Sequence, residues 1–150
     1  MPIRRSRKGR GHSKAKKVTC DGIQFKSGLE KFMYQELKKN NLFEKYEEEK
    51  FTIIDGFVLG VESYERQANG KGEFRERGSG KKVLGINYTP DFTGRDFIIE
   101  TKGYANPTFP IRWKLFKKHM KDVGDTRTLY KPQNQKECSL VINHILNSRL

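Results

Sequence analysis

The stretch YTPDFTGRDFIIETK, residues 88–102, decides the predicted fold. Residues 86–102, which include this stretch, contain two apolar pieces, Ile86–Phe92 and Asp96–Lys102. Thr93–Arg95 separates the two pieces. This pattern predicts two strands joined by a tight turn, which makes them antiparallel neighbours. Side chains alternate along a strand, so Glu100 and Lys102 share one face, and the pairing brings Asp91 close to Glu100.

Two carboxylates on adjacent strands form an oxygen-rich site that suits Mg²⁺ or Mn²⁺. Lys102 can reach the same place, where it can orient or help deprotonate an attacking water and stabilise charge on a phosphate. The alternative is a surface strand with an incidental Glu–Lys pair, worth about 0–1 kcal/mol. The spacing D-x8-E-x-K also arises by chance, so the rest of the chain must decide.

The charge balance indicates a polyanionic partner. The 150 residues contain 31 Lys and Arg against 18 Asp and Glu, a net charge of +13. Phosphate neutralisation and counterion release drive the binding of such chains to nucleic acid, and the other interpretation is that the charge only aids solubility. We expect DNA, duplex or branched, as the partner.

Nothing in the sequence predicts secretion or a membrane span. No apolar run approaches the roughly 18 residues of a span, and no apolar region follows the basic N-terminus. Cys20 and Cys138 form no CxxC pattern. We therefore expect a reduced, cytoplasmic setting and no small-molecule cofactor beyond a metal.

Residues 1–17 form a basic N-terminal segment with eight Lys or Arg and no acid. We expect this segment to be flexible by itself and to order on a phosphate backbone. A nuclear-localisation signal has a similar composition. The predicted DNA-binding residues of this N-terminal segment are Arg4, Arg5, Arg7, Lys8, Arg10, Lys14, Lys16 and Lys17.

An amphipathic helix is predicted after Ser27, a favourable N-cap residue, with apolar side chains at helical spacing up to Leu37. Two short β pieces precede it in Val18–Phe25, around an Asp21-Gly22 turn. Glu30 has two interpretations. It completes a capping box with Ser27, or it reaches from the edge of the buried face into a metal site.

A strand is predicted over Tyr46–Ile54, and the composition then shifts to Gly, Lys, Arg and Glu over Asp55–Gly85. We interpret this segment as a long basic hairpin or loop insertion. It either forms an arm that closes over DNA or is a disordered surface insertion.

Two more helices and one strand complete the predicted α/β domain, residues 18–150, in which helices flank a mixed sheet. The first helix covers Ile111–Lys121, with apolar rows that include Ile111 and Leu115. Its opposite face carries lysines that either contact DNA or are only solvated: Lys114, Lys117, Lys118 and Lys121. A strand follows at Thr126–Tyr130, and a closing helix buries Cys138, Val141, Ile142, Ile145 and Leu146 on one face.

Three motifs together resemble the PD-(D/E)XK nuclease superfamily: FKSGLE at 25–30, YTPDF at 88–92 and IETKG at 99–103. The chain is most similar to the phage endonuclease I group, which resolves branched DNA such as Holliday junctions. It also resembles small phage proteins with a DGI-x-F-x-S-x-LE opening, matched here by DGIQFKSGLE. The resemblance covers most of residues 21–131.

The resemblance implies a restriction-endonuclease-like fold and a Mg²⁺-dependent DNA endonuclease that serves recombination. It implies Asp91 and Glu100 as metal ligands with the Thr101 carbonyl, Lys102 as the catalytic lysine, and Glu30 as the acid that supports a second metal. Such enzymes also carry an acid on the first strand. Glu44, Glu47, Glu48 and Glu49 lie near that position, and Glu47 is our choice.

By analogy with such enzymes, we also expect the protein to form a homodimer. We expect it in the cytoplasm of the host cell, as for a phage-encoded protein. Two other functions remain open from the sequence. One is a DNA-binding or packaging protein without catalysis, and the other is an RNA-processing nuclease with the same site chemistry.

Overall fold

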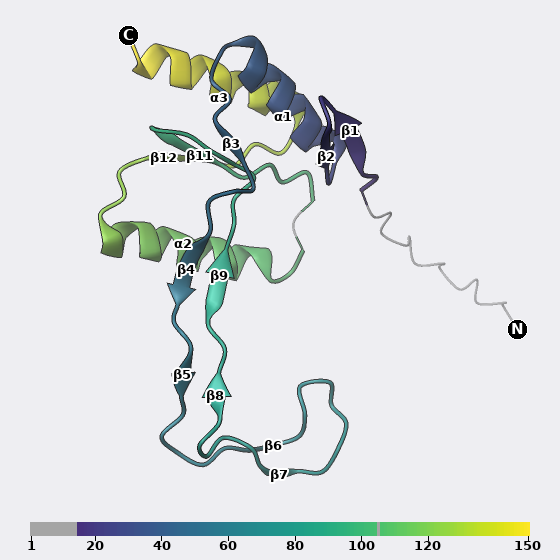
Figure 1. Cartoon of the computed structure of the whole chain (residues 1–150), viewed down its shortest axis with the longest axis vertical. Helices are drawn as coiled ribbons and strands as arrows, with labels where there is room; N and C mark the ends of the chain where they lie inside the picture. The colour runs from purple at the N-terminus through teal and green to yellow at the C-terminus, as the bar shows by residue number, and fades with distance from the viewer. Residues whose placement is uncertain (1–14, 105) are drawn as a thin grey trace, which may run out of the picture.

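A four-stranded mixed sheet lies at the centre of the computed structural model, which describes residues 15–104 and 106–150 (Figure 1). Its strand order is β12 (Thr128–Tyr130), β11 (Phe97–Ile99), β10 (Phe92–Thr93) and β3 (Lys45–Tyr46). β11 is parallel to β12 and antiparallel to β10, which is antiparallel to β3. The predicted mixed α/β sheet is confirmed.

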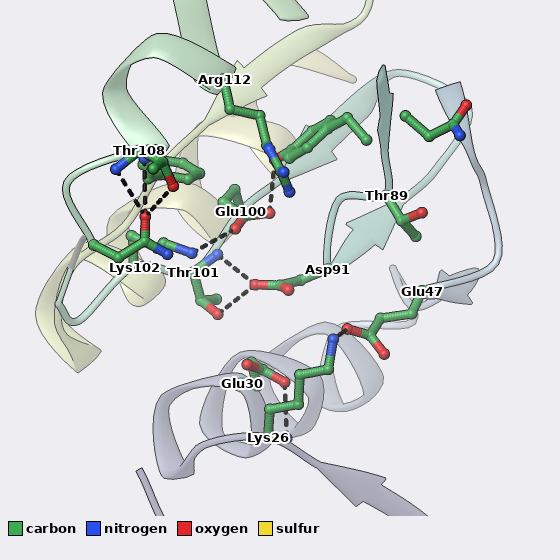
Figure 2. A pocket seen from close by; sticks show the side chains of 14 residues that line it. Lys26, Glu30, Glu47, Thr89, Asp91, Glu100, Thr101, Lys102, Thr108 and Arg112 are labelled. Atoms are coloured by element: carbon green, nitrogen blue, oxygen red, sulfur yellow. Dashed lines mark hydrogen bonds and ion pairs between the residues drawn. The ribbon is translucent and has the colours of Figure 1, made fainter. Parts of the chain in front are cut away.

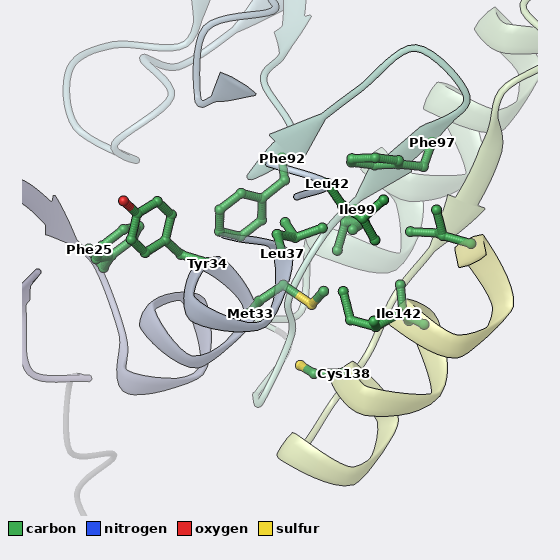
Figure 3. Close-up of a cluster of buried hydrophobic side chains, with 12 residues drawn as sticks. Phe25, Met33, Tyr34, Leu37, Leu42, Phe92, Phe97, Ile99, Cys138 and Ile142 are labelled. Atoms are coloured by element: carbon green, nitrogen blue, oxygen red, sulfur yellow. The ribbon is translucent and has the colours of Figure 1, made fainter. Parts of the chain in front are cut away.

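Helices cover both faces of this sheet. Phe97 and Ile99 pack in one apolar cluster with α1 (Gly28–Lys39) and α3 (Gln135–Ser148), shown in Figure 3. Ile98 points the other way, into a second cluster with α2 (Phe109–Val123). A strand that is buried on both faces needs an unbroken apolar run, which explains FII in the sequence.

The segment before α1 forms as predicted. β1 (Val18–Cys20) and β2 (Ile23–Phe25) are an antiparallel hairpin, and Asp21 and Gly22 turn it with φ of 51° and 76°. Positive φ at both positions matches the right-handed twist of the two strands. The Ser27 hydroxyl then accepts the Glu30 N–H at 3.2 Å, so Ser27 is the N-cap.

The predicted strand Tyr46–Ile54 is wrong as one element, because the chain leaves the central sheet after β3. Glu47 has a positive φ of 50°, and its N–H donates to the Asp91 carbonyl at 2.9 Å. β4 (Phe51–Ile54) then pairs with β9 (Ile86–Tyr88) instead. Likewise, the predicted strand Ile86–Phe92 splits into β9 and β10 around Pro90, which has no N–H to donate. The predicted turn Thr93–Arg95 is also wrong at its start, because Thr93 belongs to β10 and pairs with Ile98.

Residues 51–88 form a two-stranded ribbon, here called the arm, which projects beyond α2 (Figure 1). After β4 and β9, it consists of β5 (Phe57–Val58) paired with β8 (Lys82–Val83), and β6 (Tyr64–Glu65) paired with β7 (Arg75–Glu76). Of the two interpretations of residues 55–85, the structure therefore supports the hairpin arm. A contact between the arm and DNA stays a prediction.

The predicted helical faces need three corrections. α2 begins at Phe109, before Pro110, because proline is compatible with the first turn of a helix. Ile111 is exposed, because the sheet covers only the row of Phe109, Trp113, Phe116 and Met120. In α3, Leu146 is also exposed, whereas Cys138, Val141, Ile142 and Ile145 are buried as predicted.

Within residues 15–104 and 106–150, no helix combines the length and the apolar character that a membrane span requires.

Candidate active site

Asp91 and Glu100 lie at the open end of the β10–β11 hairpin. Phe92 pairs with Ile99 in this hairpin, so the next residues outward on the two strands are Asp91 and Glu100. Both carboxylates are buried, each with 6% of the residue exposed, and both line a pocket of about 450 Å³. The juxtaposition that the sequence predicted is confirmed.

Asp91 is fixed by the residue after Glu100. The Thr101 N–H and hydroxyl both donate to Asp91 Oδ2, at 2.7 and 2.6 Å (Figure 2). Burial, and then the charges of Glu100 and Glu30, raise the pKa of Asp91 to about 8. Two short hydrogen bonds oppose this shift without cancelling it. Burial in this pocket therefore disfavours the charged form of Asp91.

Glu100 is held from two sides. The Tyr88 hydroxyl donates to Glu100 Oε2 at 2.7 Å, and Lys102 Nζ lies 3.1 Å from Oε1. Burial and the Glu100 charge raise the pKa of Tyr88 well above its ordinary value, so the phenol stays a donor. The backbone N–H groups of Glu100 and Lys102 continue the ladder beyond β11, donating to the carbonyls of Tyr130 and Pro132. This extended backbone places both side chains on one face, as predicted.

Lys102 is positioned by an aromatic ring as well as by Glu100. Its Nζ lies 4.2 Å from the centroid of the Phe109 ring, at the start of α2. A cation over a ring face is attracted by the ring quadrupole. The ammonium therefore stays beside Glu100 at the pocket wall.

Glu30 lies in the first turn of α1 and also lines the pocket, whereas its part in a metal site stays a prediction. Its Oε1 lies 3.4 Å from the Ser27 hydroxyl, and its Oε2 accepts from the N–H of Lys26, the residue before the N-cap, at 3.0 Å. The Tyr46 hydroxyl also donates to Oε2, at 2.8 Å. Yet Glu30 is only 7% exposed and lines the same pocket as Asp91, so the helix cap delivers a third carboxylate to the site.

Glu47 is the one of the four candidate first-strand acids that lines this pocket. Its carboxylate forms an ion pair with Lys26 Nζ, and that hydrogen bond raises the pKa of Lys26. The other three candidates point elsewhere. Glu49 pairs with Arg127, with Oε1 2.7 Å from Nη2, Glu44 accepts the Arg95 N–H, and Glu48 is exposed.

Lys26, Tyr46, Tyr88 and Arg112 belong to the candidate site, and we did not predict them from the sequence. Lys26, Tyr88 and Arg112 line the pocket, and Tyr46 binds Glu30. Lys26 and Tyr88 stand inside the FKSGLE and YTPDF motifs, so the motifs themselves carried a signal. The sequence carried no signal for Arg112 or Tyr46, because only the folded chain brings α2 and β3 beside the acids.

A divalent cation fits this set of side chains. Four carboxylates and three cationic side chains line the pocket: Glu30, Glu47, Asp91 and Glu100 against Lys26, Lys102 and Arg112. In the described residues, no group of three His, Cys, Asp or Glu side chains is arranged to hold a metal ion by itself. Mg²⁺ does not require one, since it uses one or two carboxylates and keeps several waters. Asp91, Glu100 and the Thr101 carbonyl remain the predicted ligands, with Glu30 and Glu47 beside them.

The predicted DNA-binding residues fall into two groups. Residues 1–14, with Arg4, Arg5, Arg7, Lys8, Arg10 and Lys14, lie outside the described residues, whereas Lys16 and Lys17 are exposed. On α2, Lys114, Lys117, Lys118 and Lys121 are all exposed, and Lys118 pairs with Asp122. The same helix supplies Phe109 and Arg112 to the pocket, so the helix that carries the lysine face also forms part of the pocket wall.

A family model described as "Protein of unknown function (DUF1064)" matches residues 10–132. The chain belongs to this family. The matched region includes Glu30, Glu47, Asp91, Glu100 and Lys102, so the whole candidate site lies within it. Searches of curated proteins and of solved structures gave no match.

Proposed function

We propose that this DUF1064 protein is a Mg²⁺-dependent DNA endonuclease that hydrolyses phosphodiester bonds. One observation carries the proposal. Two buried carboxylates, Asp91 and Glu100, meet at the open end of one hairpin with Lys102 against Glu100, in a chain of net charge +13. A protein that only binds DNA has no use for buried acids beside phosphates, which repel them unless a cation lies between.

Each side chain has a role in this proposal. Asp91 and Glu100, with the Thr101 carbonyl, would hold Mg²⁺ or Mn²⁺, and Glu30 and Glu47 would support a second ion. A bound divalent ion supplies Lewis acidity, which lowers the pKa of water and offsets charge on the phosphate. Lys102, held by Glu100 and by Phe109, directs its N–H groups at the attacking water or at the phosphate oxygens.

Surrounding residues prepare the site before DNA binds. Thr101 fixes one oxygen of Asp91, and Tyr88 fixes one oxygen of Glu100. Tyr46 and the Lys26 N–H do the same for Glu30. Side chains held in this way lose little conformational entropy when a metal and a substrate arrive.

We further propose the restriction-endonuclease-like fold and a branched DNA substrate. The support is the mixed sheet between helices together with the FKSGLE, YTPDF and IETKG motifs, which resemble junction-resolving phage enzymes. The arm is a departure from this resemblance, which implies a short connection where the chain has residues 55–85. The DNA structure that is cut therefore needs a direct test.

The test is cleavage of a four-way junction, a nicked duplex and a linear duplex of matched sequence, with Mg²⁺ or with a chelator. We expect Mg²⁺-dependent products with 5′-phosphate and 3′-hydroxyl ends. Asp91→Asn and Lys102→Ala should each reduce the rate by about 100-fold or more. Glu62→Gln, at an exposed acid of the arm outside the pocket, is the matched control and should cleave like the wild type.

Unchanged cleavage in Asp91→Asn or Lys102→Ala would show that the site is assigned wrongly. Metal-independent binding of all three DNAs without cleavage would instead identify a binding or packaging protein on this fold. An RNA duplex of the same sequence is assayed beside the three DNAs, and its cleavage in preference to them would identify an RNA-processing nuclease.

A further inference from the structure

The arm has no apolar core of its own. No residue from 51 to 87 is buried, although Phe51 and Ile53 at its base pack against the cluster beneath α2. Nine of the fifteen exposed large apolar side chains of the described residues lie on it: Ile54, Phe57, Val58, Val61, Tyr64, Phe74, Val83, Leu84 and Ile86. The other six are scattered over the rest of the described chain. An isolated two-stranded ribbon is marginally stable in water, so a concentration of this kind indicates a contact surface.

The arm is also the electrically neutral part of the chain. We predicted a basic insertion, but residues 55–85 carry six basic and five acidic side chains, a net charge of +1. The remaining 119 residues carry the other 25 Lys and Arg and 13 Asp and Glu, a net charge of +12. The acids of the arm are Asp55, Glu62, Glu65, Glu73 and Glu76.

This charge pattern argues against DNA as the occupant of the arm. Protein surfaces that bind DNA are polar and much more positive than other interfaces. The arm instead has five acids among exposed Phe, Val and Leu side chains. This composition is typical of a protein–protein contact, with an apolar centre and mixed charges around it.

We infer that the arm is a contact surface for a second copy of this chain. The rest of the chain, at +12, repels an identical copy, so the two copies can approach with least repulsion where the charge is close to zero. A two-fold contact places the same patch against itself, which suits a patch with near-equal numbers of both signs. The ribbon also offers two free strand edges, which can pair with the same edge of the partner.

The arm exposes enough apolar area to form part of a dimer contact. Seven large apolar side chains of residues 55–85 are each about 40–80% exposed. With roughly 150–200 Å² for a side chain of this kind, they expose on the order of 600 Å² per copy. Consecutive strand residues such as Phe57 and Val58 point to opposite faces of the ribbon, so one face presents part of this area. Stable interfaces bury about 800 Å² per partner, so one face of the arm supplies part of a dimer contact and the side chains around it supply the rest.

The experiment measures the oligomeric state of the full chain by sedimentation, without DNA or metal, across the micromolar range and at two salt concentrations. Phe74→Glu and Ile111→Glu form a matched pair, because both residues are 67% exposed and only Phe74 lies on the arm. Leu84→Glu, at a residue that is 80% exposed, is a second arm variant that should not disturb the fold of the monomer.

We expect a dimer for the wild type and for Ile111→Glu, and at least a tenfold weaker dimer for Phe74→Glu and Leu84→Glu. Higher salt should strengthen the dimer, because it screens the repulsion between the basic parts of the two copies. A monomeric wild type would overturn the inference, as would a dimer that both arm variants leave intact. If Phe74→Glu weakened DNA binding without changing the oligomeric state, the arm would contact DNA instead. The outcome is independent of whether the protein cleaves DNA.

Discussion

Two antiparallel hairpins of this chain differ in what covers them. The β10–β11 hairpin is buried on both faces, by α1 and α3 on one side and by α2 on the other. The arm, 51–88, has no buried residue between 51 and 87. The first can hold two carboxylates in fixed positions because its backbone and their partners are locked by packing. The second keeps its apolar side chains available for another molecule.

The largest expected difference between these hairpins is in stability. Ile98→Ala should lower the free energy of unfolding by about 2–5 kcal/mol, because Ile98 is fully buried against α2. Leu84→Ala on the arm should change the free energy of the monomer by less than about 0.5 kcal/mol. Urea unfolding of both variants at low protein concentration measures this. Equal losses of unfolding free energy in Ile98→Ala and Leu84→Ala would mean that the Leu84 side chain is packed in solution.

The second prediction concerns the pH dependence of the buried site. Asp91 has a folded pKa of about 8, whereas an unfolded Asp has a pKa of about 3.9. Between these values the folded state binds the proton more tightly, so the contribution of Asp91 to stability falls as the pH rises from about 4 to about 8. Without divalent ions, Asp91→Asn should therefore be more stable than the wild type at pH 8, by at least about 1 kcal/mol.

Urea unfolding of both proteins at pH 5 and pH 8, with a chelator present, checks this expectation. Asn keeps an oxygen that can accept from Thr101, so the substitution removes the charge and retains the contact. The same pH slope in wild type and variant would show that Asp91 ionises normally in the folded protein.

The sequence predicts the elements whose signals are local. The Ser27 cap, the Asp21-Gly22 turn and the pairing of β10 with β11 all follow from residues within a few positions of one another. The pairing is enough to predict that Asp91 lies near Glu100, but the exact register depends on a turn that begins after Thr93, one residue later than predicted. In the same way, Glu100 and Lys102 share a face because alternation along a strand is a local property.

Contacts between distant residues could not be predicted. The break after β3 depends on the Glu47 N–H bonding to the Asp91 carbonyl, and on Glu49 pairing with Arg127, 78 residues away. Tyr88 and Tyr46 reach their carboxylates only after folding. Ile111 fits a helical apolar row, yet the sheet covers only the neighbouring row of α2.

The smallest expected effect concerns Lys26 at the edge of the site. In the absence of a metal, its ammonium pairs with Glu47 and competes with a cation for that carboxylate. Mn²⁺ should raise the Tm of the wild type, and Lys26→Ala should bind Mn²⁺ about fivefold more tightly, which corresponds to about 1 kcal/mol. Glu100→Gln should abolish the rise in Tm. Thermal melts across a Mn²⁺ titration give the Tm of the wild type, Lys26→Ala and Glu100→Gln. A wild-type Tm that Mn²⁺ does not change would count against a preformed metal site.

The most direct test compares one carboxylate from each hairpin region in a single cleavage assay. Glu100→Gln removes a buried acid beside Lys102, and Glu62→Gln removes an exposed acid on the arm. With labelled DNA and Mg²⁺, we predict cleavage by the wild type and by Glu62→Gln at similar rates, and cleavage by Glu100→Gln reduced by about 100-fold or more. A wild type that cuts none of the DNAs, or a Glu100→Gln variant that cuts as fast as the wild type, would contradict the account.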